Sequence, residues 1–328
     1  MTILITGVAG LIGSNFSRFL LNKGYKVVGI DNFYGGYEDF LPQDKNFLFY
    51  KRNLEMDSIE DIFQAEKPQA VFHFAAYAAE GLSPFIRVFN YQNNVITSVK
   101  LVNECIKHDC KLIFTSSMAV YGRSLPPFTE DMPLAPIDPY GIAKMSVESD
   151  IKQAHDHFGL RYNIVRPHNI IGVYQNIWDR YRNVVGIFIR KSLNNQSVLI
   201  YGDGKQTRAF SDIDYYMEPL EKLIYDFDND TFNIGADKFF SINEVSKIVK
   251  EIGRKNGLEV NIEHKEERNE VKHAYCNHEK AKTILNFNDE TDIERLITKM
   301  FDWAKSQPNR QVKDMKYEIE KGIYSYWK

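Results

Sequence analysis

Short apolar runs alternate with longer amphipathic stretches through the first half of this 328-residue chain. The short runs predict strands at Thr2–Thr6, Lys26–Ile30, Phe47–Tyr50, Ala70–Phe74, Lys111–Thr115 and Tyr162–Val165. The stretches between them predict helices at Leu11–Lys23, Ser58–Glu66, Phe85–His108 and Tyr140–His157. Strands separated by helices of this length pair in parallel through right-handed crossovers. The predicted fold class is therefore α/β, with a doubly wound parallel sheet covered by helices on both faces.

The second half has a less regular pattern. Its hydrophobic spacing predicts helices near Asn183–Leu193, Asp214–Phe227, Ser241–Lys255, Asp292–Lys305 and Lys316–Tyr326. We therefore expect residues 1–167 to form the sheet domain and residues 168–328 to form a smaller α/β domain that binds substrate. The chain is expected to return to the first domain around residues 209–236.

Composition excludes several classes of function. The chain has 41 Lys and Arg against 44 Asp and Glu, a net charge of −3 that favours neither nucleic acid nor a membrane surface. No apolar run approaches 18 residues, and Met1 leads directly into the first strand without room for a signal peptide. The three cysteines fit no disulfide framework and no zinc motif. We expect a reduced, cytoplasmic enzyme without a metal.

A glycine-rich turn joins the first predicted strand to the first predicted helix. Gly7, Gly10 and Gly13 are spaced by two residues within the segment Thr6–Gly13. This spacing allows a tight turn, a close approach of the backbone to a pyrophosphate, and close packing of helix on strand. The helix N-terminus then offers N–H groups to the phosphates. The position of the turn predicts a dinucleotide site.

An acidic residue stands at the end of the second strand. The Asp31 carboxylate can accept hydrogen bonds from the adenosine ribose hydroxyls, and it would repel a 2′-phosphate. NAD is therefore favoured over NADP. Asn53 and Leu54, after the third strand, are candidates for contact with the adenine, although a plain loop is the alternative interpretation.

Three further side chains have the chemistry of a hydroxyl oxidation site. Tyr140 and Lys144 are four residues apart and so share one face of a helix. A phenol has a pKa of about 10, so it needs a positive neighbour to act as a base near neutral pH. We expect the Lys144 ammonium and the nicotinamide ring to lower that pKa. Ser117, after the fifth strand, lies at the carboxyl edge where parallel sheets bind ligands.

The chain resembles the extended short-chain dehydrogenase/reductases, and among them the nucleotide-sugar epimerases of the UDP-glucose 4-epimerase type. The segments that carry the resemblance are Thr6–Gly13, Asp31-Asn32, residues 73–76, Asn94, residues 116–122, Tyr140–Lys144, residues 166–169, 202–210 and 268–271. The resemblance implies a Rossmann fold, bound NAD, a nucleoside-diphosphate sugar as substrate, with UDP favoured, and a homodimer. The dimer would pack residues 85–108 and 140–157 as a four-helix bundle. The stripe of Val95, Val99, Val102 and Ile106 fits that bundle or the chain's own sheet.

The resemblance also implies site residues. Those expected to bind the cofactor are Gly7, Gly10, Leu11, Ile12, Gly13, Asp31, Asn32, Asn53, Leu54, Phe74, Ala75, Ala76, Asn94, Tyr140 and Lys144. Those expected to bind the substrate are Glu80, Ser117, Met118, Ala119, Tyr140, Asn169, Arg208, Arg268 and Ala274. Catalysis is assigned to Tyr140, Lys144 and Ser117. Residues 174–176 and 179–183 are expected to line the pocket without assigned contacts.

The two residues after the catalytic serine narrow the choice of reaction. The 4,6-dehydratases of the family have an Asp-Glu pair at the positions of Met118 and Ala119, whose side chains here can move no proton. The pair of Cys and His that reductase-epimerases use is not seen, and His168 is interpreted as a packing or hydrogen-bonding residue. Oxidation at C4 and return of the hydride to the other face remain. The sequence therefore predicts 4-epimerisation of a nucleoside-diphosphate hexose or N-acetylhexosamine.

Substrate choice is partly readable from the resemblance. A small gating residue admits N-acetyl groups, and its counterpart is Ala274, or Tyr275 if the register slips by one. Asn277 replaces the family's usual aspartate, and the role of the acidic Glu80 stays open. The alternatives are a nucleotide-sugar 4-dehydrogenase or decarboxylase, a 4,6-dehydratase, or a non-enzymatic NAD-binding scaffold or redox sensor.

Overall fold

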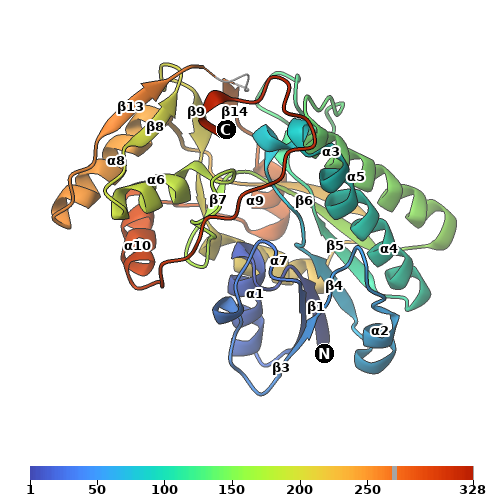
Figure 1. Ribbon diagram of the computed structural model, residues 1–328. Coiled ribbons are helices and arrows are strands. Elements are labelled where there is room, and N and C mark those ends of the chain that lie inside the picture. Colours follow the sequence, from blue (N-terminus) through green and yellow to red (C-terminus); the bar gives the residue numbers. More distant parts are fainter. Residues whose placement is uncertain (268–271, 328) are drawn as a thin grey trace.

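The computed structural model describes residues 1–267 and 272–327. Its centre is a seven-stranded parallel sheet with the order β11-β6-β5-β4-β1-β2-β3 (Figure 1). The strands are β1 (Thr2–Thr6), β2 (Lys26–Asp31), β3 (Phe47–Lys51), β4 (Ala70–His73), β5 (Lys111–Thr115), β6 (Tyr162–Pro167) and β11 (Asp230–Ile234). The order reverses beside β1, which places a ligand crevice at the carboxyl ends of β1 and β4. The expected Rossmann-type fold is confirmed.

Helices cover both faces of the sheet. Ile3 and Ile5 of β1 belong to a core shared with α1 (Leu11–Asn22), α7 (Met217–Tyr225) and α9 (Glu279–Leu285). Leu4 points to the opposite core, shared with α2 (Glu60–Glu66), α4 (Thr97–Lys107) and α5 (Pro139–Phe158). Alternate residues of one strand thus enter two cores, which explains why its sequence is apolar throughout.

The second half builds a smaller layer with a core of its own. Its helices are α6 (Val184–Leu193), α8 (Ile242–Lys255) and α10 (Ile293–Lys305). Its short strands pair as β8 (Val198–Tyr201) with β13 (Ile262–Lys265), β9 (Thr207–Ala209) with β12 (Phe239–Ser241) and β14 (His273–Ala274), and β7 (Ile170–Ile171) with β10 (Ser211–Asp212). Ser241 and Glu244 form the capping box at the start of α8. The chain also returns to the sheet, through α7 and β11; a domain boundary near residue 168 stays a prediction.

One long expected helix is divided. Residues 85–108 do not form a single helix: a 3₁₀ segment, η2 (Glu80–Phe85), precedes α3 (Arg87–Tyr91), and a π-helical segment, η3 (Gln92–Ile96), separates α3 from α4. Asn94, within η3, donates to Asn90 Oδ1 at 2.9 Å and accepts from the Tyr77 N–H at 3.0 Å. These tertiary hydrogen bonds accompany the local change of helical pitch, which hydrophobic spacing does not reveal.

The helix expected at Lys316–Tyr326 is wrong. Residues 307–324 follow an irregular path, and only η6 (Ser325–Trp327) forms a 3₁₀ turn. The backbone of Gly322 has φ of +77°, which a helix does not accommodate. Lys313 and Glu318 are hydrogen-bonded to separate parts of the molecule, and these contacts hold the segment extended.

A buried ion pair ties α5 to β6. Arg166 Nη2 lies 2.6 Å from Glu148 Oε2, Arg166 Nε donates to Glu148 Oε1 at 2.9 Å, and both residues are 1% exposed. The Ser116 hydroxyl donates to the same carboxylate, and Arg166 also donates to the Tyr121 hydroxyl at 2.7 Å. Removal of one partner from such a pair leaves an uncompensated buried charge.

We therefore predict that Glu148→Ala lowers the free energy of unfolding by about 3–5 kcal/mol. Urea unfolding followed by circular dichroism measures this value. The matched control is Glu251→Ala, which breaks the exposed pair with Arg254 and should cost less than about 1 kcal/mol. Equal losses in the two variants would contradict the structural role of the buried pair.

Candidate active site

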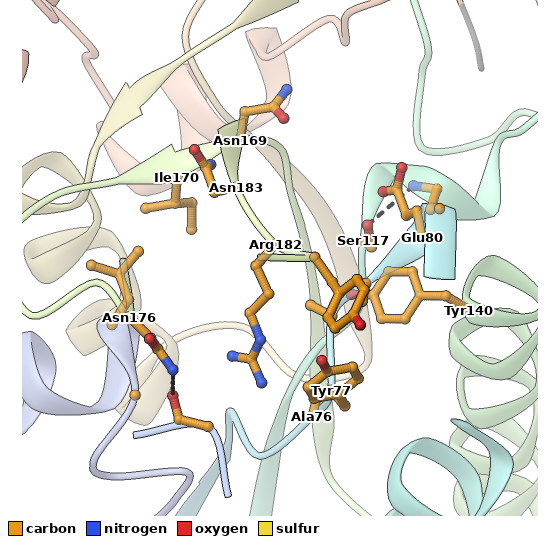
Figure 2. A pocket seen from close by; sticks show the side chains of 18 of the residues that line it. Ala76, Tyr77, Glu80, Ser117, Tyr140, Asn169, Ile170, Asn176, Arg182 and Asn183 are labelled. Atoms are coloured by element: carbon orange, nitrogen blue, oxygen red, sulfur yellow. Dashed lines mark hydrogen bonds between the residues drawn. The ribbon is translucent and has the colours of Figure 1, made fainter. Parts of the chain in front are cut away.

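One continuous cavity lies between the carboxyl edge of the sheet and the smaller layer. Its volume is about 1230 Å³, above the roughly 300–1,000 Å³ typical of a site for one small molecule. Figure 2 shows Tyr140, Ser117 and Glu80 on one side of the pocket, and Asn169 and Asn176 among the residues on the other.

The glycine turn forms one wall of this cavity. Gly7 has φ of +69°, and a Cβ there would lie 2.6 Å from the Ala75 nitrogen. A Cβ on Gly13 would lie 2.3 Å from the Gly7 carbonyl oxygen, so helix and turn pack without side chains. Gly10 stands at the N-cap of α1, and all three glycines line the cavity together with Leu11 and Ile12. Backbone N–H groups at this helix start can face a pyrophosphate.

Asp31 is held against the glycine turn. Its Oδ2 accepts from the Ala9 N–H at 2.9 Å and its Oδ1 from the Phe33 N–H at 2.7 Å. Burial raises the pKa of this carboxyl, while the two N–H groups oppose the rise. The Asn32 side chain accepts from the Tyr34 N–H. Both Asp31 and Asn32 line the cavity, where the remaining carboxylate lone pairs can accept from ribose hydroxyls.

The other residues expected at the cofactor fall into two groups. Those that line the cavity are Asn53, Leu54, Phe74, Ala75 and Ala76. Asn94 instead is 1% exposed and outside the set that lines the cavity; it holds the backbone of Tyr77. In this structure Asn94 positions the cavity wall, and its direct contact with a cofactor stays a prediction.

The three expected catalytic side chains come together. Ser117 begins the 3₁₀ segment η4 (Met118–Val120) and its hydroxyl accepts from the Ala119 N–H at 3.1 Å. Tyr140 opens α5, where Asp138 caps the helix by accepting from the Gly141 N–H. Lys144, one turn later, donates to the Thr115 carbonyl at 2.7 Å, and its Nζ lies 6.0 Å from the centre of the Tyr140 ring. All line the cavity.

The pKa of Tyr140 is shifted in the direction opposite to the one predicted from the sequence. Burial raises the pKa of Tyr140 and the nearby charge of Glu80 raises it further, while a hydrogen bond with Ser117 lowers it. Burial lowers the pKa of Lys144 to about 7. The expected acidification of the phenol by Lys144 is therefore not found in the chain alone, because desolvation of both groups outweighs it.

The smaller layer supplies the opposite wall. Asn169, just before β7, has φ of +42°, and its buried Nδ2 makes no hydrogen bond to a described residue. Arg208 and Ala274 are neighbours across β9 and β14, and both line the cavity. Glu80, Met118 and Ala119 also line it. Arg268 lies outside the described residues, so its role stays a prediction.

Arg182 is a cavity residue that sequence reasoning did not assign. Its Nε lies 3.0 Å from Asp179 Oδ2, and its guanidinium lies 4.6 Å from the centre of the Tyr77 ring. The Tyr77 hydroxyl donates to the same carboxylate at 3.2 Å. Figure 2 shows Arg182 extending between the two walls of the pocket, near Tyr77 and Ala76. Such a cation can bind a phosphate oxygen. The sequence indicated only that residues 179–183 line the pocket, with no contact assigned to Arg182.

The end of the chain also lines the cavity, a position that the sequence did not predict. The residues concerned are Val312, Asp314, Tyr324, Tyr326 and Trp327. The aromatic residues Tyr324, Tyr326 and Trp327 indicate burial of this segment, which the predicted helix does not take into account.

His168 lies behind the cavity wall. Its Nε2 is 2.7 Å from His278 Nε2, and His278 Nδ1 is 2.8 Å from Asp237 Oδ1. Burial lowers the pKa of His168 to about 3. A neutral, hydrogen-bonded imidazole agrees with the packing interpretation of this residue.

These residues fit a bound dinucleotide. Side-chain-free glycines face the cavity, a buried carboxylate stands at the end of the next strand, and the volume exceeds the need of a single ligand.

Among the described residues, no helix is long and apolar enough to cross a membrane.

Comparison with known proteins agrees with this arrangement. The model of the NAD dependent epimerase/dehydratase family matches residues 3–235. The chain is 30% identical to the UDP-glucose 4-epimerase of Halalkalibacterium halodurans, over 94% of this chain and 97% of that protein. The structure is similar to that of Thermotoga maritima UDP-glucose 4-epimerase with UDP-glucose, with a TM-score of 0.86, 31% identity, and coverage of 93% of this chain and 99% of the other.

A further similar structure is UDP-N-acetylglucosamine 4-epimerase from Methanobrevibacter ruminantium, in complex with UDP-N-acetylmuramic acid. Its TM-score is 0.85 and its identity 29%, over 94% of this chain and 99% of that chain. The family match spans the glycine turn, Asp31, Ser117, Tyr140 and Lys144. The chain therefore belongs to the NAD-dependent epimerase/dehydratase family.

Proposed function

We propose that this enzyme is an NAD-dependent 4-epimerase of a UDP-hexose or a UDP-N-acetylhexosamine, acting through a 4-keto intermediate. The observation that carries the proposal is the convergence of Tyr140, Ser117 and Lys144 with the glycine turn in one cavity large enough for cofactor and substrate. The similarity to UDP-glucose and UDP-N-acetylglucosamine 4-epimerases supports the reaction and the nucleotide.

Different residues of the chain have different roles in the proposed reaction. Bound NAD would lie along Gly7–Gly13 and Asp31, and would accept and return a hydride. Tyr140 removes the proton of the sugar hydroxyl and later gives it back, and Ser117 holds that hydroxyl by a hydrogen bond. Lys144, anchored on the Thr115 carbonyl, holds positive charge near the phenol when it is protonated. The positive charge of oxidised nicotinamide favours the phenolate that the chain alone disfavours.

The wall beyond Ser117 supports epimerisation over 4,6-dehydration. Met118 and Ala119 line the cavity where a dehydratase needs an acid and a base. Neither side chain exchanges a proton, so elimination of water has no catalyst there. Oxidation followed by return of the hydride needs only the groups already present.

The opposite wall supports a diphosphate-linked sugar. Arg208 and Asn169 line the cavity from the smaller layer, the Asn169 Nδ2 has no hydrogen-bond partner within the described part of the chain, and Arg182 extends between the walls. Guanidinium groups bind phosphate oxygens through two parallel hydrogen bonds. We assign Glu80, next to Tyr140, to the sugar end of the site.

A homodimer remains part of the proposal, with a revised surface. Of the stripe Val95, Val99, Val102 and Ile106, Val102 is buried in the chain's own core, with Val95 and Ile106 packed partly against it, while Val99 lies outside that core and is half-buried. Val88 on α3 and Ile96 on η3 are 60% and 49% exposed and offer apolar surface beside α5. A reduced cytoplasmic setting likewise stays a prediction.

Tyr140→Phe is the direct test of the reaction. We expect kcat to fall about 10²- to 10⁴-fold because the variant has no proton acceptor at the sugar hydroxyl. Proton NMR of UDP-glucose and UDP-N-acetylglucosamine incubated with each protein measures the C4 epimers. Bound NAD, quantified after denaturation, should be unchanged. Wild-type turnover retained in the variant would refute the assignment.

Ala274→Tyr tests the choice of sugar. Ala274 is buried beside Val120 and Phe128 at the cavity wall, so a phenol there would occupy space open to an N-acetyl group. We expect a selective loss of at least about tenfold in kcat/KM for UDP-N-acetylglucosamine relative to UDP-glucose. Equal losses on both substrates would contradict the gating role.

The low pKa of Lys144 predicts a pH dependence of stability. In the dinucleotide-free protein the folded-state pKa is about 7, against 10.5 for an ordinary lysine. Above pH 7 the unfolded chain keeps a proton that the folded chain has lost, so this group makes stability rise with pH, by at most about 1.4 kcal/mol per unit. Below pH 7 the cost of burying the ammonium is fully present.

Urea unfolding between pH 7 and pH 9 measures that slope. Lys144→Met should remove the contribution of Lys144, while Lys316→Met, at an exposed position, should leave the slope as in the wild type. An unchanged slope in Lys144→Met would show that the buried lysine does not titrate in this range.

A further inference from the structure

The C-terminal segment, residues 306–327, runs from α10 along the wall of the cavity. Figure 1 shows it as the dark red trace that leaves α10 and runs across the front of the molecule towards α3. Because five of its residues line the cavity, it forms part of the enclosing wall rather than a tail on the surface. We call residues 306–327 the strap.

The strap is fastened at the dinucleotide end of the site. Lys313 Nζ donates to the carbonyls of Phe33 and Tyr34 at 2.8 and 2.7 Å. The Tyr34 hydroxyl lies 2.6 Å from Met315 Sδ. Phe33 and Tyr34 directly follow Asp31-Asn32, so this contact closes the strap over the expected ribose position.

A second set of hydrogen bonds attaches the strap to α3; we call this set and the contacts of Lys313 the two fastenings. The two carboxylate oxygens of Glu318 accept from the N–H groups of Val88 and Phe89 at 2.7 and 2.8 Å, and the Glu318 N–H donates to the Phe85 carbonyl. Phe85 ends η2, which begins with Glu80 at the sugar end of the cavity. This contact therefore joins the strap to the wall beside Tyr140.

The end of the strap is buried between η2 and residues 180–181, in a hydrophobic cluster separate from the core of the smaller layer. Trp327 is 4% exposed and packs on Phe85 and Tyr181. Arg180 Nη2 donates to the Trp327 carbonyl at 2.9 Å, and Arg180 Nε pairs with Asp314 at 3.2 Å. Arg180 and Tyr181 themselves line the cavity. One segment thus bridges the cofactor end, the sugar end and the smaller layer.

We propose that the strap is a retaining element that keeps the dinucleotide, in its reduced form, and the 4-keto sugar in the site between the two hydride transfers. The proposal rests on the proposed function, and it assigns this chain to return of the keto sugar rather than its release. In the proposed role, a ligand leaves past the strap after the strap has parted from the Phe33–Tyr34 backbone or from α3. Both fastenings lie at the surface, where water can replace them, so the strap can open for substrate exchange.

The test compares the full-length wild type with Lys313→Ala/Glu318→Ala. We expect the double variant to lose bound NAD at least about tenfold faster, measured as the NAD that remains after dilution and filtration over time. Incubation with UDP-glucose should also release NADH and a 4-keto sugar, detected by absorbance at the reduced nicotinamide band and by mass spectrometry. Lys321→Ala, an exposed change within the strap, is the matched control and should behave as the wild type.

A third protein, Lys313→Arg/Glu318→Gln, separates attachment of the strap from folding because Arg keeps a donor and Gln keeps one of the two acceptor oxygens of Glu318. Its NAD retention should lie between that of the double alanine variant and that of the wild type. Equal NAD dissociation from wild type and the double alanine variant would overturn the proposal. A wild type that retains NAD yet converts no sugar nucleotide would refute the proposed epimerisation instead, and the NAD measurement would still decide the role of the strap.

Discussion

The buried pair of Arg166 and Glu148 is the contact on which the active-site geometry depends. It joins β6 to the middle of α5, the helix that carries Tyr140 and Lys144. The same carboxylate accepts from Ser116, the residue before Ser117. Two charges removed from water are tolerated because each is satisfied by the other and by added hydrogen bonds. The pair therefore sets the tyrosine helix at a defined distance from the strand end that carries the serine.

Because of the topology, the two walls of the cavity contribute different groups to the site. Reversal of strand order beside β1 opens a crevice at the carboxyl edge of the sheet, and the glycine turn and Asp31 are at that edge. The smaller layer contributes Asn169, Arg208 and Ala274 from the opposite side. Tyr140, the proposed catalytic base, lines the cavity, and burial there raises its pKa. In the proposed mechanism, activation of the phenol thus depends on a positive charge brought by the cofactor, which couples proton removal to occupancy of the dinucleotide site.

Local sequence patterns predicted the sheet well and some helices poorly. Runs such as Ala70–Phe74 are apolar on both faces, and this requirement belongs to any strand covered on two sides, so β4 is readable without its neighbours. Residues 85–108 have continuous helical periodicity, yet the hydrogen bonds of Asn94 to Tyr77, remote in sequence, accompany a π-helical segment there. The helix predicted at Lys316–Tyr326 is wrong for the same reason: Lys313 and Glu318, in the strap, have partners about 230 to 280 residues away in the chain.

Residue types and short spacings along strands and turns were enough to predict the chemistry: which residues can cradle a pyrophosphate, accept a ribose hydroxyl, and exchange a proton with an alcohol. The direction of the pKa shifts, the position of Arg182, the placement of Asn94 behind the cavity wall, and the path of the strap could not be predicted in this way. These depend on burial and on contacts between distant segments, and such contacts exist only after the chain has closed around its cavity.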